Sequence, residues 1–178
     1  MHNELRLVGA ALLAACLLFH VTPARAGAQE WRLSTKPGAA MARAWSATRW
    51  GPNLELQAEY GINDDWTIRF GASYSAFFKP GAGPEPLSLA WTGLDAAWTL
   101  DILQVVPFLF AGAAVVAVGG PDTSWRARLG LRVGLGVDYL LSRSWSLGAE
   151  ATYGLIVPDT GQVPALVTLS LRLTWIWF

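Results

Sequence analysis

Residues 125–157 read WRARLGLRVGLGVDY (125–139), LLSRS (140–144) and WSLGAEATYGLIV (145–157), and this stretch decides the fold. In the first segment one parity is apolar from Trp125 to Tyr139, while the other carries only Arg, Gly and Asp. The third segment repeats the alternation from Trp145 onward. Side chains alternate between the two faces of a β-strand, so a period of two predicts strands with one apolar face. The short polar segment between them predicts a β-hairpin.

The composition narrows the class of protein. A chain of 178 residues allows one domain. Hydrophobic residues make up 53% and charged residues 15%, with a formal net charge of zero. Nucleic-acid binding needs a basic excess, so nucleic acid is not an expected partner. The 18 Gly and 10 Trp residues are typical of strands that pack closely around a narrow lumen and are anchored at two membrane interfaces.

The first 26 residues have the pattern of a secretory signal peptide. A charged start is followed by an apolar run from Leu7 to Phe19 and by the small-residue site Ala24-Arg25-Ala26. The run is shorter than the roughly 20 residues that a spanning helix needs. The alternative is lipidation at Cys16, because Leu13-Ala14-Ala15-Cys16 resembles the lipobox of bacterial lipoproteins. We predict residues 1–26 as the signal peptide.

The predicted mature domain, residues 27–178, contains no His and no Cys. It therefore cannot form a disulfide framework, a thiol nucleophile or a His-based metal site. No cofactor, metal or catalytic residue is expected.

The alternation continues along the chain and predicts eight strands. We expect the first strand at residues 38–47, followed by a turn at Trp50-Gly51-Pro52-Asn53. In the fourth strand the apolar parity changes between Trp91 and Leu94, which predicts a β-bulge near Thr92-Gly93. The other predicted strands are residues 54–62, 66–76, 87–100, 105–118, 125–139, 145–157 and 167–177.

These strands predict an all-β fold, an eight-stranded antiparallel up-and-down transmembrane β-barrel. The predicted connections alternate in length: residues 63–65, 101–104 and 141–143 are short, whereas 46–53, 79–86, 119–124 and 158–164 are longer. Membrane barrels carry short turns on the periplasmic side, so both termini are expected in the periplasm.

Aromatic residues are expected to form two rings at the membrane interfaces. The periplasmic ring contains Tyr60, Trp66, Trp98, Tyr139, Trp145, Trp175 and Trp177. The outer ring contains Trp45, Trp50, Tyr74, Trp91, Trp125 and Tyr153. A soluble lipocalin-like barrel also alternates, with its apolar face inside. The placement of Trp and the nearly charge-free Leu and Val faces favour the membrane barrel.

The chain resembles the small outer-membrane β-barrel proteins of Gram-negative bacteria, the broad group around the OmpA transmembrane domain and OmpW. The resemblance covers residues 39–178 and rests on the strand pattern and on hairpins such as YLLSRSWSLGAE (139–150). It implies an outer-membrane location, with outer-membrane lipid and lipopolysaccharide as partners. Phe178 is similar to the C-terminal aromatic residue that such proteins present to the barrel-assembly machinery. The sequence identifies no further envelope partner.

The charged residues on the other face of the strands are expected to point into the lumen and to form salt bridges there. We predict the inward charged residues to be Glu55, Glu59, Arg69, Asp95, Arg126, Arg128, Arg132, Asp138, Glu150 and Arg172. Acids and bases are equal in number, and buried charges are tolerated when paired. Counting from the turns places Glu150 opposite Arg172 and diagonal to Arg132, and Glu59 near Arg69. The glycines of residues 130–136 would make room for arginines.

The expected function is a non-enzymatic barrel with a plugged, charge-balanced lumen and a structural or interaction role in the cell envelope. One alternative is an OmpW-like passage for small apolar molecules, entering near Phe77, Phe78 and the 79–86 loop. A lipid-modifying barrel enzyme is disfavoured, because such enzymes use a His that residues 27–178 lack. A site built only from the carboxylates Glu55 and Glu59 is conceivable, but polar lumen residues explain them more simply.

Overall fold

The computed structural model describes residues 30–44, 47–78, 87–100, 104–120, 123–157 and 165–177. The predicted signal peptide with its alternative at Cys16, and the predicted roles of Trp45 and Phe178, lie outside these ranges. So do the 79–86 and 158–164 connections. Within the described ranges, no helix is long and apolar enough to cross a membrane.

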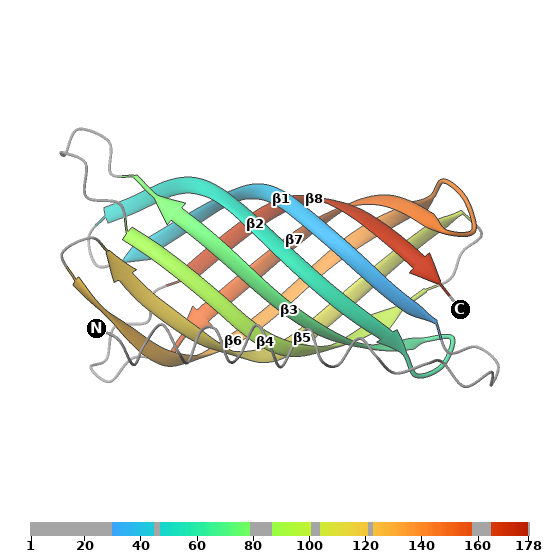
Figure 1. Ribbon diagram of the computed structural model, residues 1–178, viewed down its shortest axis with the longest axis horizontal. Coiled ribbons are helices and arrows are strands. Elements are labelled where there is room, and N and C mark those ends of the chain that lie inside the picture. Colours follow the sequence, from blue (N-terminus) through green and yellow to red (C-terminus); the bar gives the residue numbers. More distant parts are fainter. Residues whose placement is uncertain are drawn as a thin grey trace.

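Eight antiparallel strands close into a single barrel in sequence order (Figure 1). They are β1 (Trp31–Ala44), β2 (Ala47–Gly61), β3 (Trp66–Phe77), β4 (Leu87–Thr99), β5 (Val105–Gly120), β6 (Thr123–Leu140), β7 (Trp145–Ile156) and β8 (Ala165–Trp177). β1 pairs with β8 as well as with β2, and Trp31 lies opposite Trp177. The predicted eight-stranded antiparallel barrel is confirmed, with the start of β1 and the end of β8 at the same end.

The β6–β7 hairpin has the alternation that its sequence predicts. Leu131 and Leu155 are Cα partners across the two strands. The side chain of Leu131 is 53% exposed on the outside, whereas that of the next residue, Arg132, is 5% exposed and points into the barrel. The backbone N–H of Leu141 donates to the carbonyl of Trp145 at 2.9 Å and closes the turn.

β1 and β2 begin earlier than the sequence predicted. β1 starts at Trp31 and β2 at Ala47, so the expected first strand at 38–47 and the expected turn at 50–53 are wrong. Proline suggested breaks, but each proline interrupts only one of the two neighbouring ladders. Pro37 still pairs with Leu54 of β2 while its pairing with β8 lapses. Pro52 still pairs with Ala39 of β1 while its pairing with β3 lapses.

Longer strands also shorten two of the connections expected to be long. Only residues 45–46 separate β1 from β2, and only residues 121–122 separate β5 from β6. The expected loops at 46–53 and 119–124 therefore belong largely to strands. Pairing continues almost to the ends of these hairpins, as far as Ala44 with Ala47 and Gly120 with Thr123.

The predicted β-bulge in β4 is wrong. Thr92 and Gly93 pair without interruption with Ala72 and Gly71 of β3 and with β5 on the other side. Trp91 consequently stays on the inward parity and is 4% exposed. The sequence suggested a change of face because apolar side chains were expected to point outward, but the lumen is itself apolar at this level.

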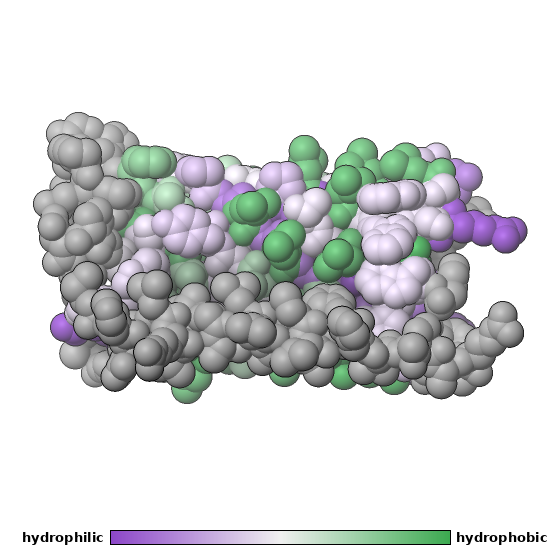
Figure 2. Space-filling model, viewed as in Figure 1, coloured by the Kyte–Doolittle hydropathy of each residue, from purple (hydrophilic) through white to green (hydrophobic). Residues whose placement is uncertain are grey.

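The outer surface of the described strands is predominantly apolar. Figure 2 shows hydrophobic side chains over the described strands of the visible face, with paler residues gathered toward the right-hand end. Aromatic pairs lie at the end where β1 begins, where the rings of Trp31 and Tyr60 are 4.9 Å apart and those of Trp175 and Trp177 are 4.8 Å apart.

Candidate functional site in the barrel lumen

Among the described residues, nine ionisable side chains are buried in the lumen, none more than 5% exposed. They are Lys36, Glu55, Glu59, Arg69, Asp95, Arg132, Asp138, Glu150 and Arg172. Each lies on the inward parity of its strand, because period-two alternation directs every second side chain into the barrel. Five acids therefore share the interior with four bases.

Arg172 is the centre of the group nearest the end where β1 begins. Its guanidinium contacts the carboxylate of Glu59 and lies 3.1 Å from an oxygen of Asp138. It also donates to the hydroxyl of Ser34 at 3.2 Å. Arg69 faces Glu59 directly across β2 and β3, with Nε 3.4 Å from Oε2. Glu59 thus lies between two guanidinium groups.

Arg132 and Lys36 form the second group. Arg132 contacts both carboxylate oxygens of Asp95 and lies 3.2 Å from Glu55. The Nζ of Lys36 is 2.8 Å from Glu55 and 2.8 Å from Glu150. Glu150 is also 3.9 Å from Arg69, which joins the two groups. All five carboxylates therefore have a cationic partner.

β5 contributes aromatic rings to this network. The guanidinium carbon of Arg69 lies 4.2 Å from the Phe108 ring centroid, and that of Arg172 lies 4.9 Å from the same ring. Such stacking suits cations that are largely removed from water. An added Cβ at Gly134 would overlap the Phe110 ring, and one at Gly136 would overlap Phe108. These two glycines thus make room for phenylalanine rings, rather than for arginines as predicted.

An apolar layer fills the other half of the lumen around Trp91. The buried members of this layer are Ala40, Ala42, Phe77, Leu89, Trp91, Ala114, Val116, Ile156 and Leu166. The indole of Trp91 reaches from β4 to β6 and β7, where an added Cβ at Gly130 or Gly154 would lie 2.8 Å from the ring. Interiors of membrane barrels are commonly polar, so this layer is unusual.

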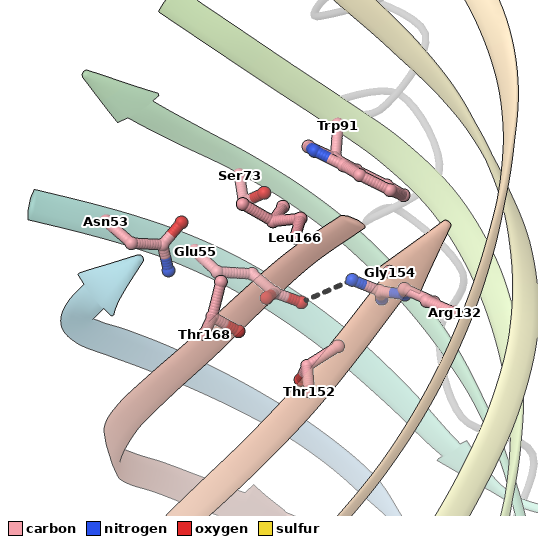
Figure 3. A pocket seen from close by; sticks show the side chains of 9 residues that line it. All are labelled: Asn53, Glu55, Ser73, Trp91, Arg132, Thr152, Gly154, Leu166 and Thr168. Atoms are coloured by element: carbon pink, nitrogen blue, oxygen red, sulfur yellow. Dashed lines mark hydrogen bonds and ion pairs between the residues drawn. The ribbon is translucent and has the colours of Figure 1, made fainter. Parts of the chain in front are cut away.

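A small cavity of about 20 Å³ separates the apolar layer from the ion pairs. In Figure 3 the side chains of Asn53, Glu55, Trp91 and Arg132 surround it, with a dashed line joining Glu55 and Arg132. The side-chain N–H groups of Asn53 and Trp91 are buried without an acceptor among the described residues. A cavity of this size accommodates about one water molecule.

Two of the predicted pairings are wrong. Gly148, not Glu150, lies opposite Arg172, and Ser170 lies opposite Glu150. Glu150 instead forms its ion pairs with Lys36 and Arg69. The Arg132 side chain pairs with Asp95 and Glu55 rather than with Glu150. Counting from a turn finds neighbours on adjacent strands, whereas long side chains reach across the barrel to strands that are not adjacent.

The composition of the network also differs from the prediction. Arg126 is exposed and Arg128 half-buried, so neither belongs to the nine buried charges. Lys36 takes part although the sequence reasoning missed it, because β1 was expected to begin only at residue 38. The signal was present in the inward parity of Arg32, Ser34 and Lys36 beside Trp31 and Leu33.

Most of the predicted interface aromatics lie on the outer surface. Those with a half-buried or exposed side chain are Tyr60, Trp66, Trp98, Tyr139, Trp145, Trp175 and Trp177 at one end and Trp50, Tyr74, Trp125 and Tyr153 toward the other. Trp91 is the exception and belongs to the lumen. The described ranges contain no group of three or more His, Cys, Asp or Glu side chains arranged to hold a metal ion.

Comparison with known proteins relates this barrel to a protein family and to solved structures. The family described as outer membrane protein beta-barrel domain matches residues 11–171. No curated protein gives a match. Neisserial surface protein A (NspA) is 23% identical with a TM-score of 0.68, covering 82% of this chain and 96% of that chain.

Two more distant structures have the same fold. Ail of Yersinia pestis is 14% identical with a TM-score of 0.57, covering 83% of this chain and 98% of its own. PagL, described as an outer membrane enzyme, is 15% identical with a TM-score of 0.55, covering 80% and 97%. At these identities the likeness shows the fold alone.

Proposed function

Because the chain belongs to the outer membrane protein β-barrel domain family, we propose that it is a non-enzymatic barrel whose lumen is closed to solutes. Its role would be structural or in interactions within the cell envelope. The family and the structurally similar proteins are bacterial outer-membrane barrels. The observation that carries the proposal is the stacking of a buried ion-pair network and an apolar layer in one lumen.

The two layers oppose solute passage in different ways. Ions crossing the first would have to separate pairs such as Lys36–Glu150 and Arg172–Glu59, which join non-neighbouring strands across the barrel. Separating a buried pair leaves an uncompensated charge and costs several kcal/mol. Ions crossing the second would have to lose water beside Trp91 and its apolar neighbours. The cavity between them is the size of one water molecule.

The lack of His and Cys in residues 27–178 and the pairing of the buried carboxylates support a non-enzymatic role. Residues 27–178 contain no His or Cys, and each of the five buried carboxylates is ion-paired. The alternative carboxylate site would consist of Glu55 and Glu59. Glu55 contacts Lys36 and Arg132. Glu59 contacts Arg69 and Arg172. General acid–base work requires a group that can exchange its proton with a bound substrate.

We further propose that both ends of the barrel sequence face the periplasm. The connections at the end where β1 begins are at most five residues long (62–65, 100–104 and 141–144), whereas the two longest connections, residues 78–86 and 157–164, join strands at the other end. Membrane barrels carry their longer loops on the outer side. The partners would then be outer-membrane lipid, lipopolysaccharide and, during insertion, the barrel-assembly machinery.

Single-channel recording of the refolded full domain in a planar bilayer tests the closed lumen. We expect wild-type protein with heat-modifiable gel migration to give no conductance steps. Trp91→Ala should produce steps or transient openings, because it empties the centre of the apolar layer. Trp98→Ala is the matched control, since it removes an indole from the outer face of the same strand. Regular conductance by the wild type would contradict the proposal.

The second candidate is a passage for small apolar molecules. The apolar layer favours this candidate, because Phe77, Leu89 and Trp91 give the lumen an apolar surface that such molecules could contact. The rate at which vesicles take up an apolar dye distinguishes the two candidates. Uptake that is faster with wild-type protein than with protein-free vesicles, and that is altered by Phe77→Ala, would favour passage over closure.

A further inference from the structure

Arg43 breaks the pattern of the outer surface. Among the strand positions that the structure describes with outward-facing side chains, it alone carries a charge. It lies on the parity of Leu33, Ala39 and Met41, and its side chain is exposed. A charge on the lipid face costs about 2–4 kcal/mol at the bilayer midplane and at most about 1 kcal/mol near an interface.

The position of Arg43 along β1 places it at an interface. Arg43 lies twelve positions after Trp31, whose ring contacts that of Tyr60 at the other end of the barrel. A strand rises about 3.3 Å per residue and is tilted by about 40°, so this separation corresponds to roughly 30 Å along the barrel axis. The apolar band of such barrels is about 25 Å tall. If Trp31 marks one boundary, Arg43 reaches the headgroups beyond the other.

Further donors lie beside it on the same face. Thr48, the Cα partner of Arg43 on β2, is exposed. Trp50, the partner of Met41, is 56% exposed on the outside. A guanidinium, a hydroxyl and an indole N–H therefore share the outer face of one hairpin. The segment 41–50 reads MARAWSATRW and contains no acid; its second positive charge, Arg49, lies on the inward parity opposite Ala42.

We propose that Arg43, with Thr48 and Trp50, binds a phosphate group of lipid A in the outer leaflet. Guanidinium binds phosphate through paired charge-assisted hydrogen bonds, and its long stem lets the charge reach the headgroup while its methylenes stay among acyl chains. The indole suits the interface itself. The choice of lipid A rests on the proposed orientation, which puts this end of the barrel in the outer leaflet.

Lipid retention measured on the intact refolded barrel tests the site. Native mass spectrometry would compare bisphosphorylated lipid A, the same lipid A without phosphates, and phosphatidylglycerol. We expect wild-type protein to prefer bisphosphorylated lipid A, and Arg43→Gln to lower its retention about tenfold or more. Arg43→Lys should recover part of it, because an ammonium keeps the charge without the paired geometry. Arg143→Gln, in the exposed turn at the other end, is the matched control.

The outcomes separate this site from the proposed function. Unchanged retention by Arg43→Gln, or equal retention of lipid A without phosphates, would overturn it. Equal or greater retention of phosphatidylglycerol would overturn the choice of lipid A. Labelling of Arg143→Cys on intact cells reports the orientation separately: we expect no labelling by an impermeant reagent, and labelling would overturn the orientation and this inference with it. Heat-modifiable migration of each variant verifies folding.

Discussion

Replacing Arg172 with Met should lower the free energy of unfolding by about 3–5 kcal/mol, the usual cost of removing one partner from a buried ion pair. Arg172 is fully buried and contacts Glu59, Asp138 and Ser34. Glu59 would keep Arg69 at 3.4 Å, but Asp138 would lose its cationic partner in the described part of the chain. The orphaned Asp138 carboxylate is therefore expected to account for much of the loss.

A double variant separates the orphaned charge from the lost packing. Arg172→Met combined with Asp138→Asn removes both charges, so we expect it to be about 1–3 kcal/mol more stable than Arg172→Met alone. Reversible urea unfolding in lipid vesicles, followed by tryptophan fluorescence, measures the three stabilities. Arg143→Met, in the exposed β6–β7 turn, should stay within about 0.5 kcal/mol of wild type. The reasoning is refuted if Arg172→Met costs less than about 1 kcal/mol, or if the double variant is no more stable than the single one.

Three further changes probe other layers of the barrel. Gly136→Val should destabilise the fold by about 1–3 kcal/mol, since its side chain would displace the Phe108 ring from Arg69 and Arg172; an unchanged urea midpoint would count against this packing. Leu171→Arg, on an outward position of β8 that is 64% exposed, should cost about 2–4 kcal/mol in bilayers if this face meets lipid, whereas Arg at a soluble surface would be neutral. Gly154→Leu should destabilise the fold by about 1–3 kcal/mol, since its side chain would overlap the Trp91 indole; an unchanged urea midpoint would argue against the close contact of Trp91 with β7.

Much of the fold follows from local patterns. β3, β6, β7 and β8 begin and end within two residues of their predicted limits, because each alternates cleanly and is bounded by polar turns or loops. The limits of β1 and β2 were harder to predict, because proline is usually a turn signal. A strand in a barrel tolerates proline when the ladder on one side remains paired. The face of Trp91 was missed because the parity of apolar residues reports the lipid side only where the lumen is polar.

The sequence predicts which charged residues lie in the lumen better than it predicts which of them form ion pairs. Eight of its nine buried charges were expected from parity, and the ninth, Lys36, was missed through the late start predicted for β1. The pairings depended on contacts between residues far apart in the chain, such as Lys36 with Glu150, 114 positions away, and Glu59 with Arg172, 113 positions away. Their register across the barrel is set by closure and shear, which no single strand encodes.

The sequence by itself determined the period-two strands, their number and the absence of His and Cys from residues 27–178, because these are properties of composition and nearest neighbours. The tertiary structure decided which cation pairs with which carboxylate. It also decided the inward direction of Trp91, whose ring packs against two glycines. Closing the sheet brings non-neighbouring strands within reach of one another, and only that closure sets which side chains meet across the lumen.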